Sequence, residues 1–282
     1  MLTQFNPRVR ALGAVAVLAL LLSGCSIVEE GPSGAWTSPS VSPSPSAAPI
    51  TAHEKLTASV PTYRTPSYSW SVVNEGLRDG WTESEGVVNP PAKTYQLVNV
   101  VRDVETGVAT NWHLRVVHPQ TWLRILLDNP QNLEGFPEYP RKWGLIDQEL
   151  VKDSGLSLAW DLLSKDPARV GLLFRAIVEV RETGPSVFEG TIDLTKAKLA
   201  EAVDGEIVTA LGPKAKAIPF RALLDSEGRI LDVVLKVPAS AKSKPITQRI
   251  AYRHYGKIPP VVPPTAAETA PTTDDVYELI NS

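Results

Sequence analysis

The sequence predicts an α+β domain built on an antiparallel sheet, and two observations lead to this fold class. First, β-rich runs follow one another with short turns between them; residues 95–104 and 108–117, for example, are separated by Glu105-Thr106-Gly107. Second, only two intervals between the strands have helical spacing. Strands joined by short turns pair antiparallel, and scarce helices between strands disfavour βαβ units.

Each further strand is predicted from an apolar or β-branched run that ends at turn residues. Within residues 108–117, Trp112, Leu114 and Val116 alternate with His113 and Arg115, which predicts one apolar and one polar face. A loop rich in Pro, Asn and Gly is predicted over residues 128–141. The remaining predicted strands are residues 121–127, 143–146, 187–194, 218–224, 229–237 and 246–255, with a hairpin turn at 225–228.

Three helices are predicted from capping residues and apolar spacing. The first begins at Asp166-Pro167, with Asp as N-cap and Pro at the first helical position. The second covers residues 195–210 and ends before Gly212, and a short terminal helix follows Thr273-Asp274-Asp275. The apolar stripe of the first helix consists of Val170, Leu173, Phe174, Ile177 and Val178. The folded domain is predicted at residues 67–258, followed by a proline-rich connector and the terminal helix at 259–282.

Residues 1–24 have the pattern of a bacterial export signal. Arg8 and Arg10 precede an apolar run at residues 11–22, which is too short to span a bilayer. The run ends in Leu22-Ser23-Gly24-Cys25, which resembles the lipobox of bacterial lipoproteins. The resemblance implies that Cys25 is acylated and becomes the first residue after cleavage. The alternative is an ordinary secretory signal with an incidental cysteine.

Residues 25–66 are predicted to be a disordered tether behind the lipidated cysteine. They are rich in Ser, Pro, Thr and Ala, most clearly at residues 38–46, and such a segment buries too little apolar surface to fold. His53 and Glu54 match the start of a zinc-protease motif, but Thr57 stands where the second histidine is required, so both are assigned to the tether.

Composition excludes several classes of protein and of site. The chain of 282 residues has a formal net charge of −3, which argues against a nucleic-acid partner. Its single cysteine allows neither an intramolecular disulfide nor a cysteine-based zinc site. No glycine-rich loop follows a strand and opens a helix, so no phosphate-cradling motif is present. We therefore expect no cofactor and no metal.

The titratable residues do not form a catalytic motif. His113 and His118 are five residues apart on a predicted strand, which would place them on opposite faces, and His254 is assigned to the surface. The carboxylate pairs Glu83/Glu85 and Asp274/Asp275 are assigned to loop and cap positions. We therefore expect that the protein is not an enzyme and that it has no catalytic residue.

Tryptophans gather in the first part of the predicted domain. Two interpretations are open: a tryptophan-rich core, or an apolar cavity between the sheet and its helices. The six residues concerned are Trp70, Trp81, Trp112, Trp122, Trp143 and Trp160.

Part of the domain resembles the mycobacterial LppX and LprG type of lipoprotein. The resemblance rests on Asp166-Pro167 with its helix, on residues 187–194 (Val-Phe-Glu-Gly-Thr-Ile-Asp-Leu), on the 218–237 hairpin, and on the closing residues 250–256 (Ile-Ala-Tyr-Arg-His-Tyr-Gly). It implies a LolA-like half-barrel, that is, a strongly curved antiparallel sheet with helices on its concave face and a cavity for acyl chains. It implies no catalytic residue.

The leading functional hypothesis is a lipoprotein on the extracytoplasmic face of the cell membrane that binds or transfers an apolar ligand, a lipid or a glycolipid. Its expected partners are the cytoplasmic membrane, through the anchor, and that ligand. The alternative is a non-catalytic interaction or sensor module for an envelope protein.

Overall fold

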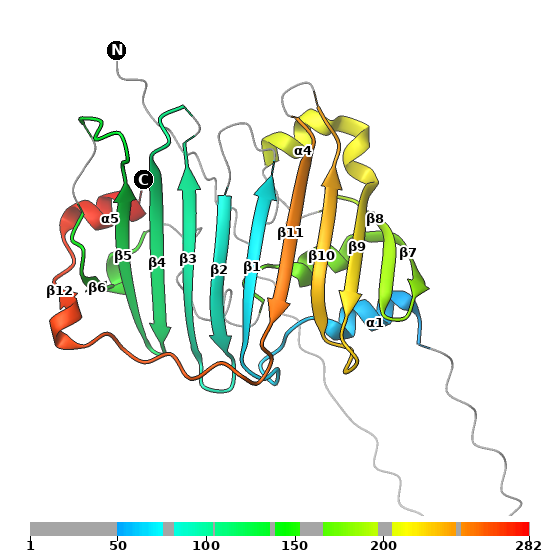
Figure 1. The fold of residues 1–282 in the computed structure, drawn as a ribbon, viewed down its shortest axis with the longest axis horizontal. Helices are drawn as coiled ribbons and strands as arrows, with labels where there is room; N and C mark the ends of the chain where they lie inside the picture. Colours follow the sequence, from blue (N-terminus) through cyan, green and yellow to red (C-terminus); the bar gives the residue numbers. More distant parts are fainter. Residues whose placement is uncertain are drawn as a thin grey trace, which may run out of the picture. The chain divides into compact units, whose positions relative to one another are not determined.

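The computed structural model describes residues 50–75, 82–103, 105–135, 139–152, 166–196, 205–240 and 244–281. Thr51–Ser282 is a compact unit, separate from Met1–Ile50. The described strands form one twelve-stranded sheet (Figure 1).

The strands succeed one another in hairpins along most of the chain. They are β1 Tyr68–Glu75, β2 Thr82–Asn89, β3 Thr94–Arg102, β4 Ala109–Val117, β5 Gln120–Asp128, β6 Trp143–Leu145, β7 Ile177–Gly184, β8 Val187–Ile192, β9 Ile218–Leu224, β10 Ile230–Val237, β11 Ile246–Arg253 and β12 Thr269–Ala270. The α-helices are α1 Ala52–Ser59, α3 Val170–Arg175, α4 Gly205–Leu211 and α5 Asp274–Ile280. Short 3-10 helices are η1 Gln148–Leu150, η3 Gly212–Lys216 and η4 Ala266–Glu268.

The strand order is β12-β6-β5-β4-β3-β2-β1-β11-β10-β9-β8-β7. The pairs are antiparallel except β12 with β6, which are parallel. The pairing of β1 with β11, seven residue pairs from Ser69↔Arg253 to Glu75↔Thr247, joins two distant parts of the chain. Because β7 and β12 stand at opposite ends of the order, the sheet is open. The predicted α+β class with an antiparallel sheet is confirmed in this form.

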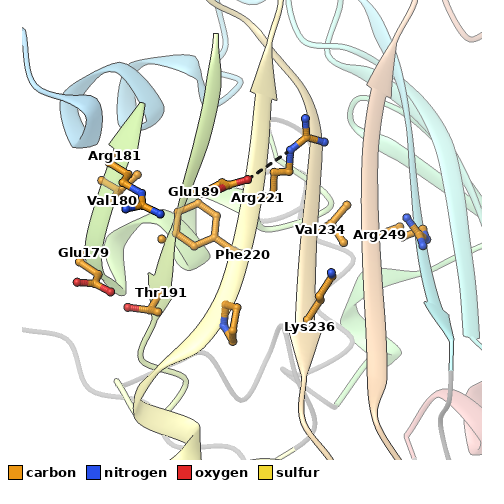
Figure 2. A pocket seen from close by; sticks show the side chains of 12 residues that line it. Glu179, Val180, Arg181, Glu189, Thr191, Phe220, Arg221, Val234, Lys236 and Arg249 are labelled. Carbon is orange, nitrogen blue, oxygen red and sulfur yellow. Dashed lines mark ion pairs between the residues drawn. The ribbon is translucent and has the colours of Figure 1, made fainter. Parts of the chain in front are cut away.

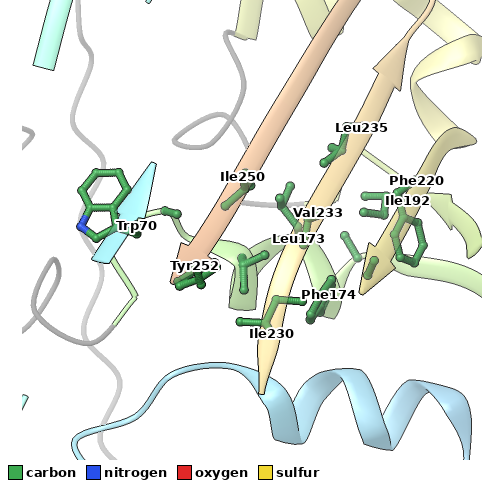
Figure 3. Packing of buried hydrophobic residues seen from close by; sticks show 14 of the residues in the cluster. Trp70, Leu173, Phe174, Ile192, Phe220, Ile230, Val233, Leu235, Ile250 and Tyr252 are labelled. Carbon is green, nitrogen blue, oxygen red and sulfur yellow. The ribbon is translucent and has the colours of Figure 1, made fainter. Parts of the chain in front are cut away.

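One face of the sheet, called the packed face below, carries the core. Register places Trp70 opposite Tyr252 and Val233 opposite Ile250, and all four are buried. Figure 3 shows these side chains with those of α3. Alternate residues of each strand thus form one continuous apolar layer across the seam between β1 and β11.

The helices contribute to this same layer. Leu56 of α1, Leu173 and Phe174 of α3, and Ile280 of α5 are at most 1% exposed and belong to the core cluster. The ring of Phe174 lies 6.3 Å from that of Phe220 on β9, centroid to centroid. The helices therefore cover the packed face.

The opposite side, called the open face below, is partly covered by the C-terminal segment. The guanidinium Nη1 of Arg115 on β4 donates to the carbonyl oxygen of Val262 (3.4 Å), and η4 and β12 follow that residue. The guanidinium groups of Arg115 and Arg124 both stack on the ring of Trp143 on β6, 4.6 and 4.7 Å from its centroid. Such stacking stabilises a cation against an aromatic face.

The prediction of a disordered tether through residue 66 is wrong at its C-terminal end. Thr51 and Glu54 form a reciprocal capping box at the start of α1, and Leu56 is fully buried. His53 and Glu54 therefore belong to a folded helix. The prediction failed here because it extended the Ser- and Pro-rich composition of residues 38–46 over a helix that begins with its own capping residues.

The helix that follows Asp166 is shorter in the structure than the apolar stripe predicted from the sequence. It ends at Arg175, and Ile177 and Val178 begin β7 instead. Its N-cap position is Arg169 in the left-handed region, while the Asp166 carboxylate accepts from the backbone N–H groups of Val170 and Gly171. The helix predicted at residues 195–210 falls partly outside the described residues; α4 accounts for its end.

The hairpins and the terminal helix are confirmed. β3–β4 and β9–β10 pair as predicted, and α5 lies where the Thr273-Asp274-Asp275 cap indicates it. Strands β1, β2, β7 and β12 were not predicted. The carboxylate pair Glu83/Glu85, assigned to a loop, lies on β2.

Candidate functional site

A concavity among the described residues, called the larger hollow, lies over β7 to β11 on the open face. It has a volume of about 700 Å³, and side chains from all five strands line it (Figure 2). Arg221 lines it from the open face, whereas its chain neighbour Ala222 is buried on the packed face. The prediction that helices pack on the concave face of the sheet is not confirmed; the helices cover the packed face, which is opposite this hollow.

Strand register places charged residues in one row across the larger hollow. Arg181 on β7 is opposite Glu189 on β8, and Glu189 is opposite Arg221 on β9. Val234 on β10 then follows, and Arg249 on β11 ends the row. Because side chains directly across neighbouring strands share one face, these five project from the same side of the sheet.

The lining has an excess of positive charge. Four lining residues are cationic (Arg181, Arg221, Lys236 and Arg249), whereas two are anionic (Glu179 and Glu189). The whole chain has the opposite sign, with a formal net charge of −3. A concave surface of one sign concentrates ligands of the other sign, so the hollow favours anionic groups.

The arginines of the row are only loosely paired. Arg221 Nε lies 3.9 Å from Glu189 Oε1, and the two side chains are 59% and 45% exposed. Arg249 Nε lies 3.4 Å from Glu75 Oε1, and both are similarly exposed. Among the described residues, no ion pair involves Arg181 or Lys236. Exposed pairs of this kind stabilise a fold little, so their cations can exchange partners at low cost.

Two strand glycines bring neighbouring backbones close together. A Cβ built on Gly190 of β8 would collide with the carbonyl oxygen of Glu179, and one on Gly86 of β2 would collide with that of Gln96. Gly190 lines the larger hollow, and Gly86 lines a smaller one of about 340 Å³ over β11, β1, β2 and β3. Glycine in a strand permits a bend or close approach that any side chain prevents.

A buried polar cluster connects α3 to the sheet. Besides its two backbone donors, the Asp166 carboxylate accepts a hydrogen bond of 2.7 Å from the Tyr252 hydroxyl. Burial raises the pKa of Asp166 above its ordinary value, although the N–H of Gly171 and the Tyr252 hydroxyl act in the opposite direction. Its partners bind the carboxylate on every side, so this cluster is structural.

The residues singled out from the sequence do not converge. Cys25 lies outside the described residues. His113 packs edge-on against Trp143, at 6.4 Å between ring centroids, and burial together with the charge of Arg124 lowers the pKa of His113. His118 precedes Pro119 beyond the end of β4, and His254 contacts Ser69 through Nδ1 (2.9 Å). The described residues contain no group of three or more His, Cys, Asp or Glu positioned to hold a metal ion.

The described tryptophans form part of the core and of the covered open face. Trp70, Trp122 and Trp143 are at most 5% exposed, and Trp112 is half-buried against the core. Trp81 and Trp160 fall outside the described residues. None of the four described tryptophans except Trp70 lines either hollow. For the described part of the chain, the interpretation as packing residues holds.

The charged row was not predicted from the sequence. Each of its charged residues projects from the solvated face of its strand, where charged side chains are ordinary. Their alignment depends on the pairing of five strands, of which β7 was not predicted and its first two residues, Ile177 and Val178, were assigned to a helix. Arg181, Glu189 and Arg221 therefore carried no distinguishing signal.

Comparison with known proteins adds little. No protein-family model matches the chain, and no curated protein matches it. Among solved structures it is similar to a LolA superfamily protein from Nitrosomonas europaea, with 8% sequence identity and a TM-score of 0.21. The match covers 79% of this chain and 94% of the other. A likeness this weak supports no conclusion about a ligand, so function is argued from the site. No helix in the described ranges is long and apolar enough to cross a membrane.

Proposed function

We propose that this protein is a lipoprotein of the cell membrane, anchored through Cys25 on the extracytoplasmic face, whose folded domain binds a lipid or glycolipid without catalysing a reaction. The observation that carries the binding function is the larger hollow. Its volume of about 700 Å³ falls within the range of small-molecule sites. The Leu22-Ser23-Gly24-Cys25 pattern supports the anchor, and two acyl chains are enough for stable anchoring.

The lining of the hollow suits an amphiphile better than a wholly apolar ligand. Val234 and Pro219 provide apolar surface on β10 and β9, next to the cations of the same strands. The core on the packed face is filled by side chains such as Leu173 and Leu235, which are fully buried. The larger hollow therefore offers its binding space on the open face of the sheet.

Binding is tested by native mass spectrometry and by displacement of a fluorescent phospholipid. The chain is used from residue 26 onward, which keeps every described residue. Val234→Asp places a carboxylate in the hollow and is expected to weaken lipid binding about tenfold or more. Val178→Asp is the matched control, because Val178 is 55% exposed on β7 and does not line the hollow. Equal binding by both variants, or no bound lipid in the unmodified chain, overturns the proposal.

The anchor has its own test. Cys25→Ala should move the protein from the membrane fraction to the soluble fraction of fractionated cells, because the thiol that accepts the lipid is removed. Continued membrane retention of this variant would contradict acylation at Cys25.

A second candidate function is an interaction module for an envelope protein. The apolar core favours it, since the packed face is covered by helices whose side chains, such as Leu173 and Phe174, are fully buried in that core. In-cell cross-linking from Arg221→Cys distinguishes the two functions. A single stoichiometric protein adduct supports the module, whereas lipid recovery without such an adduct supports the lipid-binding protein.

A further inference from the structure

The charges of the larger hollow are unevenly distributed along its row. The lining carboxylates, Glu179 and Glu189, lie on β7 and β8. Arg221 on β9, Lys236 on β10 and Arg249 on β11 lie on the other side, where no lining residue is a carboxylate (Figure 2). Three cations on three adjacent strands thus form a basic patch within the hollow.

The spacing of this patch is set by the sheet. Neighbouring strands lie about 4.8 Å apart, so residues in register two strands apart are separated by about 10 Å. Arg221 and Arg249 are such residues, because both are paired with Val234 on the strand between them. In the structure the two guanidinium groups also turn away from each other, that of Arg221 toward Glu189 on β8 and that of Arg249 toward Glu75 on β1, so one phosphate does not reach both in these conformations. A ligand with several anionic groups along a chain can reach both.

The donors of the patch remain available. In the described part of the chain, the ion pairs of Arg221 and Arg249 use Nε alone, which leaves the terminal nitrogens of each guanidinium for a ligand. Guanidinium groups bind phosphate with paired hydrogen bonds, and a lysine adds a compact charge.

We propose that the basic patch of Arg221, Lys236 and Arg249 binds a linear polyphosphodiester, which forms the polar part of the ligand held in the larger hollow. This inference rests on the proposed function for the identity of the site and adds the chemical class of the polar part. The chain of phosphates would run across the strands from β11 toward β9, where Glu189 limits its further extension by charge repulsion.

Inorganic polyphosphate is the probe, and its binding to the chain from residue 26 onward is measured by calorimetry at several salt concentrations. Binding should weaken steeply with salt, as expected when a polyanion releases counterions. The Arg221→Gln, Lys236→Gln, Arg249→Gln variant should bind at least about tenfold more weakly and lose about two to three units of salt slope. Inorganic phosphate at equal phosphorus concentration should compete poorly.

Two further variants distinguish binding by the basic patch from an effect of the protein's overall charge. Arg64→Gln, Arg141→Gln, Lys257→Gln removes the same charge from exposed positions outside both hollows and should leave affinity nearly unchanged. Glu189→Gln removes the carboxylate beside Arg221 and should raise affinity about threefold. A merely structural role of these residues would not produce a gain.

The outcomes for the two proposals are distinguishable. Phospholipid binding with no polyphosphate binding, or with equal loss in both triple variants, overturns the polyphosphodiester inference and leaves the proposed function standing. Polyphosphate binding that depends on the patch, in a chain that binds no lipid, supports the patch and overturns the proposed function. Preference for anionic vesicles over polyphosphate at equal charge overturns the inference in favour of a membrane surface. Circular dichroism of each variant confirms that it is folded.

Discussion

At the scale of single residues, Asp166 shows how one carboxylate can serve a helix and a sheet together. Its two oxygens accept from the first backbone N–H groups of α3 and from the hydroxyl of Tyr252 on β11. The sequence predicted Asp166 as the N-cap of this helix. Its carboxylate does cap the helix, although the N-cap position is Arg169, three residues later. The contact with Tyr252 could not be predicted, because 86 residues separate the two along the chain.

The raised pKa of Asp166 predicts a specific pH dependence. Because the folded state favours the protonated carboxyl, its contribution to stability is fully present below the ordinary pKa of 3.8 and is lost as pH rises through the raised folded value. The free energy of unfolding of the wild type, minus that of Asp166→Asn, should therefore fall as pH rises from below 3.8 toward neutrality. Urea titrations across this pH range measure the difference.

Tyr252→Phe is the control for this prediction. It removes a donor that stabilises the charged carboxylate, so it should raise the folded pKa of Asp166 further and extend the fall to higher pH. A difference between wild type and Asp166→Asn that is constant with pH, or that rises with pH, would contradict the account of burial given above.

At the scale of elements, the sequence predicted structures that depend on local signals, such as hairpins, and missed others. The hairpins β3–β4 and β9–β10 were predicted because a turn, such as the one closed by Gly107 at φ 71°, lies between two alternating runs. The start of β7 was mistaken for helix because Ile177 and Val178 continue the helical stripe of α3. Helix α1 was missed although it has a capping box, because it buries only one leucine and one serine and so shows no apolar stripe.

Strand β8 gives the second prediction, which concerns the shape of the hollow. In Gly190→Val, the new Cβ would meet the carbonyl of Glu179 on β7, so the two strands must separate. Clashes of this kind in a packed element cost about 2–4 kcal/mol of unfolding free energy. Urea denaturation measures the loss. Gly184→Ala is the control, because the nearest atom to its Cβ would be 4.0 Å away.

The outcome of this substitution also bears on binding. If Gly190→Val leaves stability within about 0.5 kcal/mol of the wild type, the close approach of β7 and β8 is not required by the fold. If it destabilises the protein and also weakens polyphosphate binding, the geometry of the strands contributes to the site. The charges of the basic patch are unchanged in this variant.

At the scale of the folded unit, the seam between β1 and β11 determines whether the sheet is one cooperative structure. On one side lie β1 to β6 with β12, and on the other lie β7 to β11; each set consists largely of hairpins between chain neighbours. The seam has seven residue pairs, and the core continues across it through Trp70 beside Tyr252 and Val72 beside Ile250. No sequence periodicity encodes this pairing, because its strands are more than 170 residues apart.

The seam predicts that the whole sheet unfolds in a single transition. Every described tryptophan lies on β1, β4, β5 or β6. In a variant with Trp36→Phe, Trp81→Phe and Trp160→Phe, tryptophan fluorescence therefore reports on one side of the seam, whereas far-ultraviolet circular dichroism reports on all strands. If the core is continuous, urea should give coincident midpoints and slopes for the two probes. A fluorescence transition displaced from that of circular dichroism would show that the two sides unfold separately, and that the hollow over β7 to β11 belongs to a unit stable without β1 to β6.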